Sequence, residues 1–284
     1  MILVTGANGN VGGELVTQLA SANHGVRALV RSPKGIARAA NVETMVGDLD
    51  RPESVAPALE GVRGVFLLGG YRDMPGLLAE IRRAGVEHVV LLSSRSVVGG
   101  DPSNAIVHMW MTSEEAVRSS GIAWTLVRPS GFASNALRWL PQLRAGDLVR
   151  APFANAPIAS IDPHDIAAVA AVALTTKGHE SRSYALSGPE AQIPARQVEI
   201  LAKVLGRDLR FEAQPDDEAR AELGRSAPAG FVDAFFRFFV KGEFDDATVL
   251  ATVKEVTGQT PRTFEQWARA HRADFQMTAG GDQQ

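Results

Sequence analysis

The chain has 284 residues, of which 29 are Lys or Arg and 32 are Asp or Glu, so its formal charge at pH 7 is −3. This balance excludes a polybasic nucleic-acid binder and an acidic disordered segment. The 45% of hydrophobic residues suffice for a globular core, and the absence of Cys excludes disulfides, zinc–thiolate sites and thiol nucleophiles.

No targeting or membrane segment is readable in the sequence. Ile2, Leu3 and Val4 follow Met1 with no basic region or cleavage site. The longest apolar run, residues 166–174, is shorter than the roughly 20 residues that cross a bilayer. We therefore expect a cytoplasmic protein without a membrane partner. The motifs of zincins, α/β-hydrolases and P-loop proteins are missing, and we expect no metal site.

In the first half of the chain, short β-branched runs alternate with helix-like segments, a pattern typical of a parallel sheet covered on both faces. The runs are apolar throughout, as in strands buried on both faces. Six strands are predicted at residues 2–5, 26–31, 42–46, 62–68, 86–92 and 124–127. Helices are predicted at residues 12–22, in a stretch opened by Asp50-Arg51-Pro52, and at residues 75–84 and 112–120.

The pattern changes after Pro129. Four prolines within residues 129–162 indicate loop and short helix laid over the sheet. Further helices are predicted at residues 163–175, 195–205, 228–240, 247–256 and 264–271, with short strands at 183–186 and 209–213. We therefore predict an α/β fold: a Rossmann-type, doubly wound parallel sheet in residues 1–150, a smaller, mainly helical, interleaved substrate lobe in residues 151–277, and a flexible tail at residues 278–284.

A glycine-rich turn between the first strand and the first helix is the strongest local signal. Gly6 permits a tight turn, Gly9 lets backbone N–H groups approach an anion, and Gly12 lets the helix pack near the strand. A dinucleotide pyrophosphate would lie at the N-terminus of that helix; the alternative is a turn without a ligand. The predicted cofactor contacts here are Thr5, Gly6, Asn8, Gly9, Asn10, Val11 and Gly12.

Charges after the second strand predict which dinucleotide binds. An acidic residue there would bind a ribose 2′-hydroxyl, but no Asp or Glu occurs between Glu14 and Glu43. Arg31 closes the strand and Lys34 follows, which favours NADPH over NADH because a guanidinium forks onto phosphate oxygens. The alternative is that both are solvated surface charges.

Two further strand ends carry residues suited to a cofactor. Asp48, after the third strand, can accept from an adenine amino group, with Leu49 packing on the ring. Leu68, Gly69 and Gly70 end the fourth strand and leave room for a cofactor at the switch point of the sheet.

These residues resemble the atypical short-chain dehydrogenase/reductases, in particular the NmrA-like group and its branch of NAD(P)H-quinone reductases and triphenylmethane reductase. The first half matches densely and the second half thinly. The matching segments are residues 5–12, Gly47-Asp48-Leu49, Leu91-Leu92-Ser93-Ser94, residues 113–121, residues 124–129, Ser134-Asn135, residues 162–167 and residues 261–267.

The resemblance implies a nicotinamide cofactor over the strand ends and a substrate pocket beside residues 129–139. By motif position, Ser93 and Ser94 would approach the nicotinamide ribose. The residues that would flank the nicotinamide are Pro129, Ser130, Gly131 and Phe132, and those expected to contact the substrate are Phe132, Asn135, Trp139 and Phe153.

The chain departs from the parent superfamily at its Tyr-x-x-x-Lys pair. Tyr71 and Tyr184 have no Lys four residues later, and the motif positions fall on Ile106 and Trp110, which cannot transfer protons. The candidate catalytic residues are therefore Ser94 and His108. The ordinary pKa of a histidine, about 6.5, suits acid catalysis near neutral pH. The alternative for His108 is a surface or capping residue ahead of a helix.

We hypothesise an NADPH-dependent reductase that passes hydride to a flat, electron-poor acceptor such as a quinone, an enone or a polycyclic aromatic ring, since such acceptors need little acid from the protein. The alternative is a non-catalytic NAD(P)-sensing regulator of the NmrA type. The Phe-rich run at residues 235–239 is interpreted first as helix core or a homodimer surface and second as a substrate wall.

Overall fold

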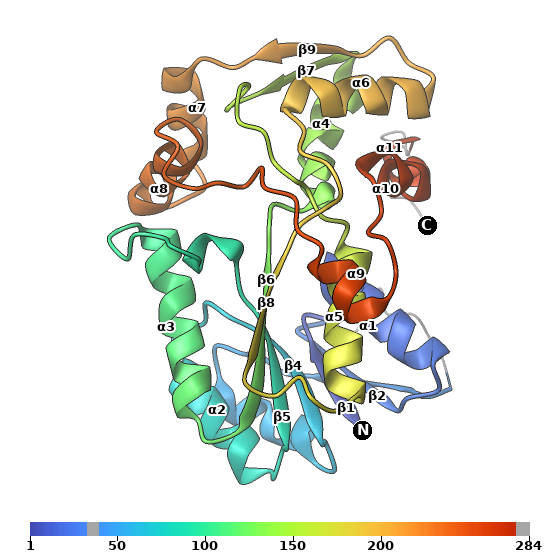
Figure 1. The fold of residues 1–284 in the computed structure, drawn as a ribbon, viewed down its shortest axis with the longest axis vertical. Coiled ribbons are helices and arrows are strands. Elements are labelled where there is room, and N and C mark those ends of the chain that lie inside the picture. The colour runs from blue at the N-terminus through green and yellow to red at the C-terminus, as the bar shows by residue number, and fades with distance from the viewer. Residues whose placement is uncertain (33–39, 277–284) are drawn as a thin grey trace.

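The computed structural model describes residues 1–32 and 40–276 and is built around one parallel sheet (Figure 1). Its seven strands lie in the order β3-β2-β1-β4-β5-β6-β8. The first six follow the order of dinucleotide-binding sheets, with the switch point between β1 and β4. The strands are β1 (Ile2–Thr5), β2 (Val26–Val30), β3 (Val42–Val46), β4 (Gly64–Leu68), β5 (His88–Leu92), β6 (Ala123–Pro129) and β8 (Arg182–Leu186). The predicted Rossmann-type α/β fold is confirmed.

Helices cover both faces of the sheet because the central strands are apolar on both sides. One hydrophobic cluster joins the sheet to α1 (Asn10–Ser21) and α5 (Pro163–Thr175), with α9 (Thr252–Thr257) packed against α5. The other cluster joins the opposite face to α2 (Met74–Arg83), to α3 (Ala105–Ser119), and to the 3₁₀ segments η1 (Pro52–Ser54) and η2 (Ala56–Leu59). The carboxyl ends of the strands are left open between these layers.

A smaller lobe lies over those carboxyl ends (Figure 1). Its two-stranded parallel sheet and several helices enclose a separate core around the fully buried Trp267. The elements of the lobe are η4 (Ala133–Trp139), α4 (Leu140–Ala145), β7 (Leu148–Ala151), α6 (Pro194–Leu205), β9 (Arg210–Ala213), α7 (Asp216–Leu223), α8 (Ala229–Phe239), α10 (Phe264–Ala270) and α11 (Arg272–Gln276).

The two parts of the chain interleave. The segment 133–151 already belongs to the lobe, whereas α5, β8 and α9 return to the layers of the large sheet. The short strand expected at residues 183–186 is β8, which pairs with β6 rather than with the lobe, so the sheet has seven strands instead of six. A division of the chain at residue 150 stays a prediction, and the predicted tail at 278–284 lies outside the described residues.

Several predicted elements are corrected. β3 is an edge strand in which three of the five residues are exposed, so it is not buried on both faces. The stretch after Asp50 forms η1 and η2 in place of an α-helix, and the helix expected at 247–256 begins only at Thr252. β7 and α7 lie where no strand or helix was expected.

The largest correction concerns α3, which begins seven residues before the predicted start. Asn104 caps it, because its Oδ1 accepts from the N–H groups of Ile106 and Val107. The first two turns are apolar on more than one face because they contact both the sheet layers and α8, so they lack a simple helical stripe.

Among the described residues, no helix combines the length and the apolar composition needed to cross a membrane.

Candidate active site

Within the described part of the chain, the turn between β1 and α1 leaves the first N–H groups of the helix without hydrogen-bond partners. Gly6 has φ +61°, and the Gly9 N–H donates to the Gly6 carbonyl at 2.8 Å, which closes the turn. No side chain caps α1, and no acidic residue lies in its first turn. The N–H groups from Asn10 to Gly12 therefore point out of an uncapped helix end, an arrangement that attracts phosphate.

The glycines of this turn fit a dinucleotide. A Cβ at Gly12 would lie 2.2 Å from the Gly6 carbonyl oxygen, so only Gly lets α1 approach the strand. A Cβ at Gly9 would lie 3.1 Å from the same oxygen and would otherwise face open space, the place where a pyrophosphate would lie.

The other predicted residues of the turn hold it in place. The Thr5 hydroxyl accepts from the Leu68 N–H at 3.1 Å, joining the ends of β1 and β4, and Val11 is buried in the core. The Asn8 side chain donates to the Ser32 carbonyl, and the Asn10 side chain donates to the Ser134 hydroxyl at 3.0 Å. The last contact links the turn directly to the lobe.

Arg31, Tyr71 and the acidic loop after β3 gather at the adenosine end of the predicted site. Burial raises the pKa of Tyr71, the nearby Arg31 opposes that rise, and Asp50 and Asp48 add to it. Arg31 itself is exposed at the end of β2. Tyr71 was missed as a site residue by the sequence analysis, although its place directly after Gly69 and Gly70 at a strand end was a usable signal. Lys34 lies outside the described residues.

The two residues predicted to bind adenine are partly engaged by the protein. The Asp48 carboxylate accepts from the Asp50 N–H at 3.1 Å and from Arg51 Nε at 3.3 Å, which orders its loop. Leu49 is buried in the core with Leu29, so its side chain packs beneath the sheet.

At the end of β4, Gly69 and Gly70 let α3 pack closely. A Cβ at Gly69 would lie 2.9 Å from the Trp110 ring, and the Gly70 N–H donates to the Ser113 hydroxyl at 2.9 Å. Leu68 covers Gly6 from the same side.

The two serines after β5 differ in their surroundings. Ser93 is buried and donates to Glu114 at 2.6 Å, and Arg128 donates two bonds to the same carboxylate. This network fixes the end of β5 against α3 and β6. The Ser94 hydroxyl accepts from the Ser96 N–H at 3.2 Å and lies on the wall of a cavity.

The segment after β6 forms the floor of that cavity. The Ser130 hydroxyl donates to the Ala159 carbonyl, and the Gly131 N–H donates to Asp246 Oδ2 at 3.0 Å. Asp246 is buried, its Oδ1 has no hydrogen-bond partner among the described residues, and burial raises its pKa to about 7. No sequence pattern predicts this contact, because 115 residues separate the partners.

The cavity measures about 500 Å³ and lies between the strand ends and the lobe. Nine predicted site residues line it: Ser93, Ser94, Pro129, Ser130, Gly131, Phe132, Asn135, Trp139 and Phe153. Other predicted residues that the structure describes lie outside the cavity: those of the turn after β1, Arg31, and those of the loop after β3. The two sets fit the two ends of an extended cofactor that crosses the strand ends.

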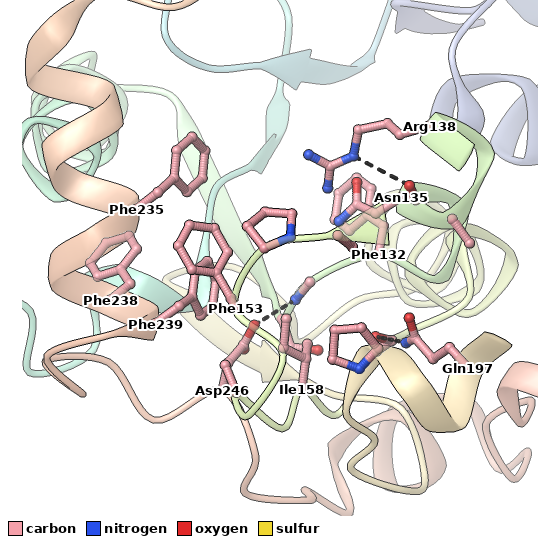
Figure 2. Close-up of a pocket in the computed structure, with 18 of the residues that line it drawn as sticks. Phe132, Asn135, Arg138, Phe153, Ile158, Gln197, Phe235, Phe238, Phe239 and Asp246 are labelled. Carbon is pink, nitrogen blue, oxygen red and sulfur yellow. Dashed lines mark hydrogen bonds between the residues drawn. The ribbon is translucent and has the colours of Figure 1, made fainter. Parts of the chain in front are cut away.

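Aromatic rings form one wall of the cavity. Figure 2 shows Phe235, Phe238 and Phe239 on one helix, facing Phe153. The Phe153 ring lies 5.2 Å from the Phe239 ring and has a backbone φ of +58°, a strained value for this residue type. The run 235–239 therefore serves both interpretations: Phe236 and Phe238 are buried in core clusters, while Phe235, Phe238 and Phe239 line the cavity.

The turn of α3 beside the cavity is apolar. Ile106 and Trp110, which stand at the positions of the missing Tyr-x-x-x-Lys pair, both line the cavity. His108 lies within α3 rather than ahead of it, is exposed, and does not line the cavity. The structure therefore places His108 outside the cavity. Within residues 1–32 and 40–276, no three His, Cys, Asp or Glu side chains form a group that could hold a metal ion.

Residues 6–177 match a protein-family profile described as NAD(P)H-binding. The chain belongs to this family. It is 41% identical over 280 residues to the (4-alkanoyl-5-oxo-2,5-dihydrofuran-3-yl)methyl phosphate reductase of Streptomyces griseus, covering 97% of this chain and 99% of the relative. It is 34% identical over 286 residues to the NAD(P)H azoreductase of Xenophilus azovorans, covering 97% and 99% of the two chains.

Solved structures share the fold. The NADPH complex of a quinone oxidoreductase from Escherichia coli superposes with a TM-score of 0.76 at 22% identity, covering 96% of this chain and all of that one. The triphenylmethane reductase of Citrobacter superposes with a TM-score of 0.77 at 20% identity, covering 97% and 99%. The resemblance to the NmrA-like atypical reductases is confirmed at the level of the fold. The protein is an NAD(P)H-dependent reductase.

Proposed function

We propose that this reductase transfers hydride from NADPH to a conjugated, electron-poor acceptor, such as an enone, a quinone or a polycyclic aromatic ring, without a Tyr–Lys proton relay. The observation that carries the proposal is the cavity itself. It is wide and aromatic, and Ile106 and Trp110 occupy the turn of α3 where a proton relay would stand.

Such a cavity suits acceptors that spread the incoming negative charge over carbonyl oxygens. Bound NADPH would supply two electrons and one hydrogen as hydride, and water would supply the remaining proton. The protein then has to orient the acceptor and keep competing water away from the reacting faces. Phe132, Phe153 and Phe239 can hold a flat ring by stacking and by apolar contact.

The names of the relatives support this acceptor class. The Streptomyces griseus name describes a ring C=C bond conjugated with a lactone carbonyl and an alkanoyl carbonyl. The other relative is named for reducing azo compounds, and the Escherichia coli structure is named for quinones. These groups share one property: each accepts hydride into a conjugated system, so an acid from the protein is not essential.

Arg31 supports NADPH as the preferred cofactor. It lies exposed at the end of β2, near Tyr71, and no Asp or Glu follows β2 before Glu43. A guanidinium at this place would bind a ribose 2′-phosphate, and the missing carboxylate would not repel it.

The test is a spectrophotometric assay of NADPH oxidation with four acceptors: menadione, an acylated butenolide, an azo dye and a simple ketone. We expect turnover with the conjugated acceptors and none with the ketone, which needs a protein acid. Tight NADPH binding without turnover on any conjugated acceptor would contradict the proposal.

A further inference from the structure

The lining of the cavity is not uniformly apolar, and the exception lies on η4. Among the described residues that line it, two are cationic, Arg138 and Arg150. Arg150 is neutralised, since it pairs with Glu212 at 2.7 Å and with Glu218 at 3.0 Å. Arg138 forms no ion pair with any described residue. Its one hydrogen bond to residues that the structure describes runs from Nε to the Asn135 carbonyl at 3.2 Å, so both terminal nitrogens are available to a ligand.

The 3₁₀ geometry of η4 explains why Arg138 faces the cavity. With three residues per turn, side chains at positions i and i+3 lie above one another. Phe132, Asn135 and Arg138 follow this spacing and all line the cavity. Figure 2 shows the Arg138 guanidinium beside Asn135, on the same side as Phe132. No hydrogen bond within the described part of the chain engages the Asn135 side-chain amide, so it too is free to bind a ligand.

The surroundings of Arg138 favour an anion over water. The side chain is open to solvent through the cavity, but the cavity walls desolvate the guanidinium and lower its pKa. It stays charged at neutral pH, because the ordinary pKa of arginine is above 12. A cation that is partly desolvated and lacks a carboxylate partner gains most from an oxyanion with which it forms paired hydrogen bonds.

We infer that Arg138 and Asn135 form a subsite for an oxyanion, a phosphate monoester or a carboxylate, carried by the acceptor at a distance from its reducible ring. This inference rests on the proposed function of the cavity, since Phe132 is the residue expected beside the nicotinamide. A 3₁₀ helix rises about 2 Å per residue, so each three-residue step along this face covers about 6 Å. The reducible ring would lie at the Phe132 end and the anionic group one to two ring widths away.

Binding of three non-reducible probes to the protein loaded with NADP⁺ tests the inference without any turnover. The probes are 1-naphthyl phosphate, 1-naphthoate and 1-naphthol, which share one ring system and differ in the anionic group. We expect wild type to bind at least one anionic probe about tenfold or more tightly than 1-naphthol. The anionic probe that binds more tightly, the phosphate or the carboxylate, identifies the oxyanion that the subsite prefers.

Two variants assign that preference to Arg138. Arg138→Ala should abolish it while leaving 1-naphthol affinity within twofold, and Arg138→Lys should restore part of it. Arg144→Ala is the matched control: Arg144 is an exposed arginine of α4 outside the cavity, and its loss removes the same charge. Increasing salt should weaken the anionic probes in wild type and in Arg144→Ala only.

Two results would overturn the inference: equal affinity of wild type for all three probes, or equal weakening of all three by Arg138→Ala. Because none of the probes is reduced, these results are independent of the acceptor assay. A reductase that turns over conjugated acceptors but shows no anion preference would keep the proposed function and lose the subsite.

Discussion

The cofactor turn and the acceptor cavity are built in opposite ways. The turn after β1 offers backbone N–H groups from one short segment, and its specificity for an anion follows from the missing side chains of Gly9 and Gly12. The cavity is made of side chains from β6, η4, α3, α8 and the segment around Asp246, which are brought together only by the fold. A backbone site tolerates little change, whereas a side-chain site can change its ligand by single substitutions.

This difference explains how one family of folds can keep a cofactor and vary its acceptor. The proposed phosphate contacts would come from the main chain, so they would persist wherever the turn persists. The contacts that the aromatic wall and Arg138 can offer an acceptor depend on the identity of these side chains, so single substitutions can change them. The predictions below test each side of this contrast, from the largest expected effect to the smallest.

Asp246→Asn should remove a pH dependence of stability that originates under the cavity. Burial raises the pKa of Asp246 from 3.8 to about 7, so between these values the folded protein binds more protons than the unfolded chain. Stability is therefore lost as pH rises toward 7, by roughly 4 kcal/mol for about three pKa units. The unfolding temperatures of wild type and Asp246→Asn should thus diverge between about pH 4 and about pH 8. Over this range the unfolding temperature of wild type should fall relative to that of the variant.

Asp245→Asn is the control for this effect. Asp245 is exposed, and a hydrogen bond from Thr248 lowers its pKa. Asp245→Asn should therefore not become more stable relative to wild type as the pH rises. Parallel pH profiles of wild type and Asp246→Asn would show that Asp246 is ionised in the folded protein across this range.

Gly9→Val should weaken NADPH binding at least about 100-fold, or about 2.7 kcal/mol, because a branched side chain would fill the space above the N-terminus of α1. Gly9 has φ −85°, which any residue adopts, so thermal stability without cofactor should change little. Calorimetry measures the affinity. Gly13→Ala, with its Cβ in ordinary contact 3.5 Å from the Ala7 carbonyl, should bind NADPH as wild type does. Equal loss in both variants would argue against a pyrophosphate at Gly9.

Arg31→Ala should raise the Kd for NADPH about tenfold and leave the Kd for NADH unchanged, because only the former carries a 2′-phosphate. Titration with both cofactors provides its own control. A similar loss for both would assign Arg31 a role in shaping the loop and leave the cofactor preference to other residues.

His108→Ala should change kcat by less than about twofold and leave its pH profile as in wild type, since the side chain is exposed and outside the cavity. A large fall in kcat with loss of one ionisation from the profile would identify His108 as a proton donor. It would contradict the proposal that the reaction needs no acid from the protein.

Elements made of contiguous residues were predicted better than groups of residues that only the fold brings together. The strand–turn–helix around Gly6, Gly9 and Gly12 is specified by contiguous residues, and so are most strands of the sheet. The start of α3 was missed because its first turns are apolar on several faces, and β7 was hidden in a proline-rich segment.

The cavity was readable only in part. Phe132, Asn135, Trp139 and Phe153 were predicted, whereas Arg138 was overlooked although it shares a three-residue spacing with two of them. Asp246 carries no local signal, since its role depends on Gly131, 115 residues away. Side chains that meet through tertiary structure need the fold before their chemistry can be assigned.

Transfer of deuterium from NADPH labelled at the nicotinamide C4 tests the central claim most directly. A conjugated lactone or enone is reduced under single turnover, and the product is analysed by mass spectrometry and NMR. Direct hydride transfer predicts one deuterium on the acceptor carbon that is β to the carbonyl and a solvent proton on the α carbon. A product without deuterium at the β carbon, or no product while labelled NADPH stays bound, would contradict the account.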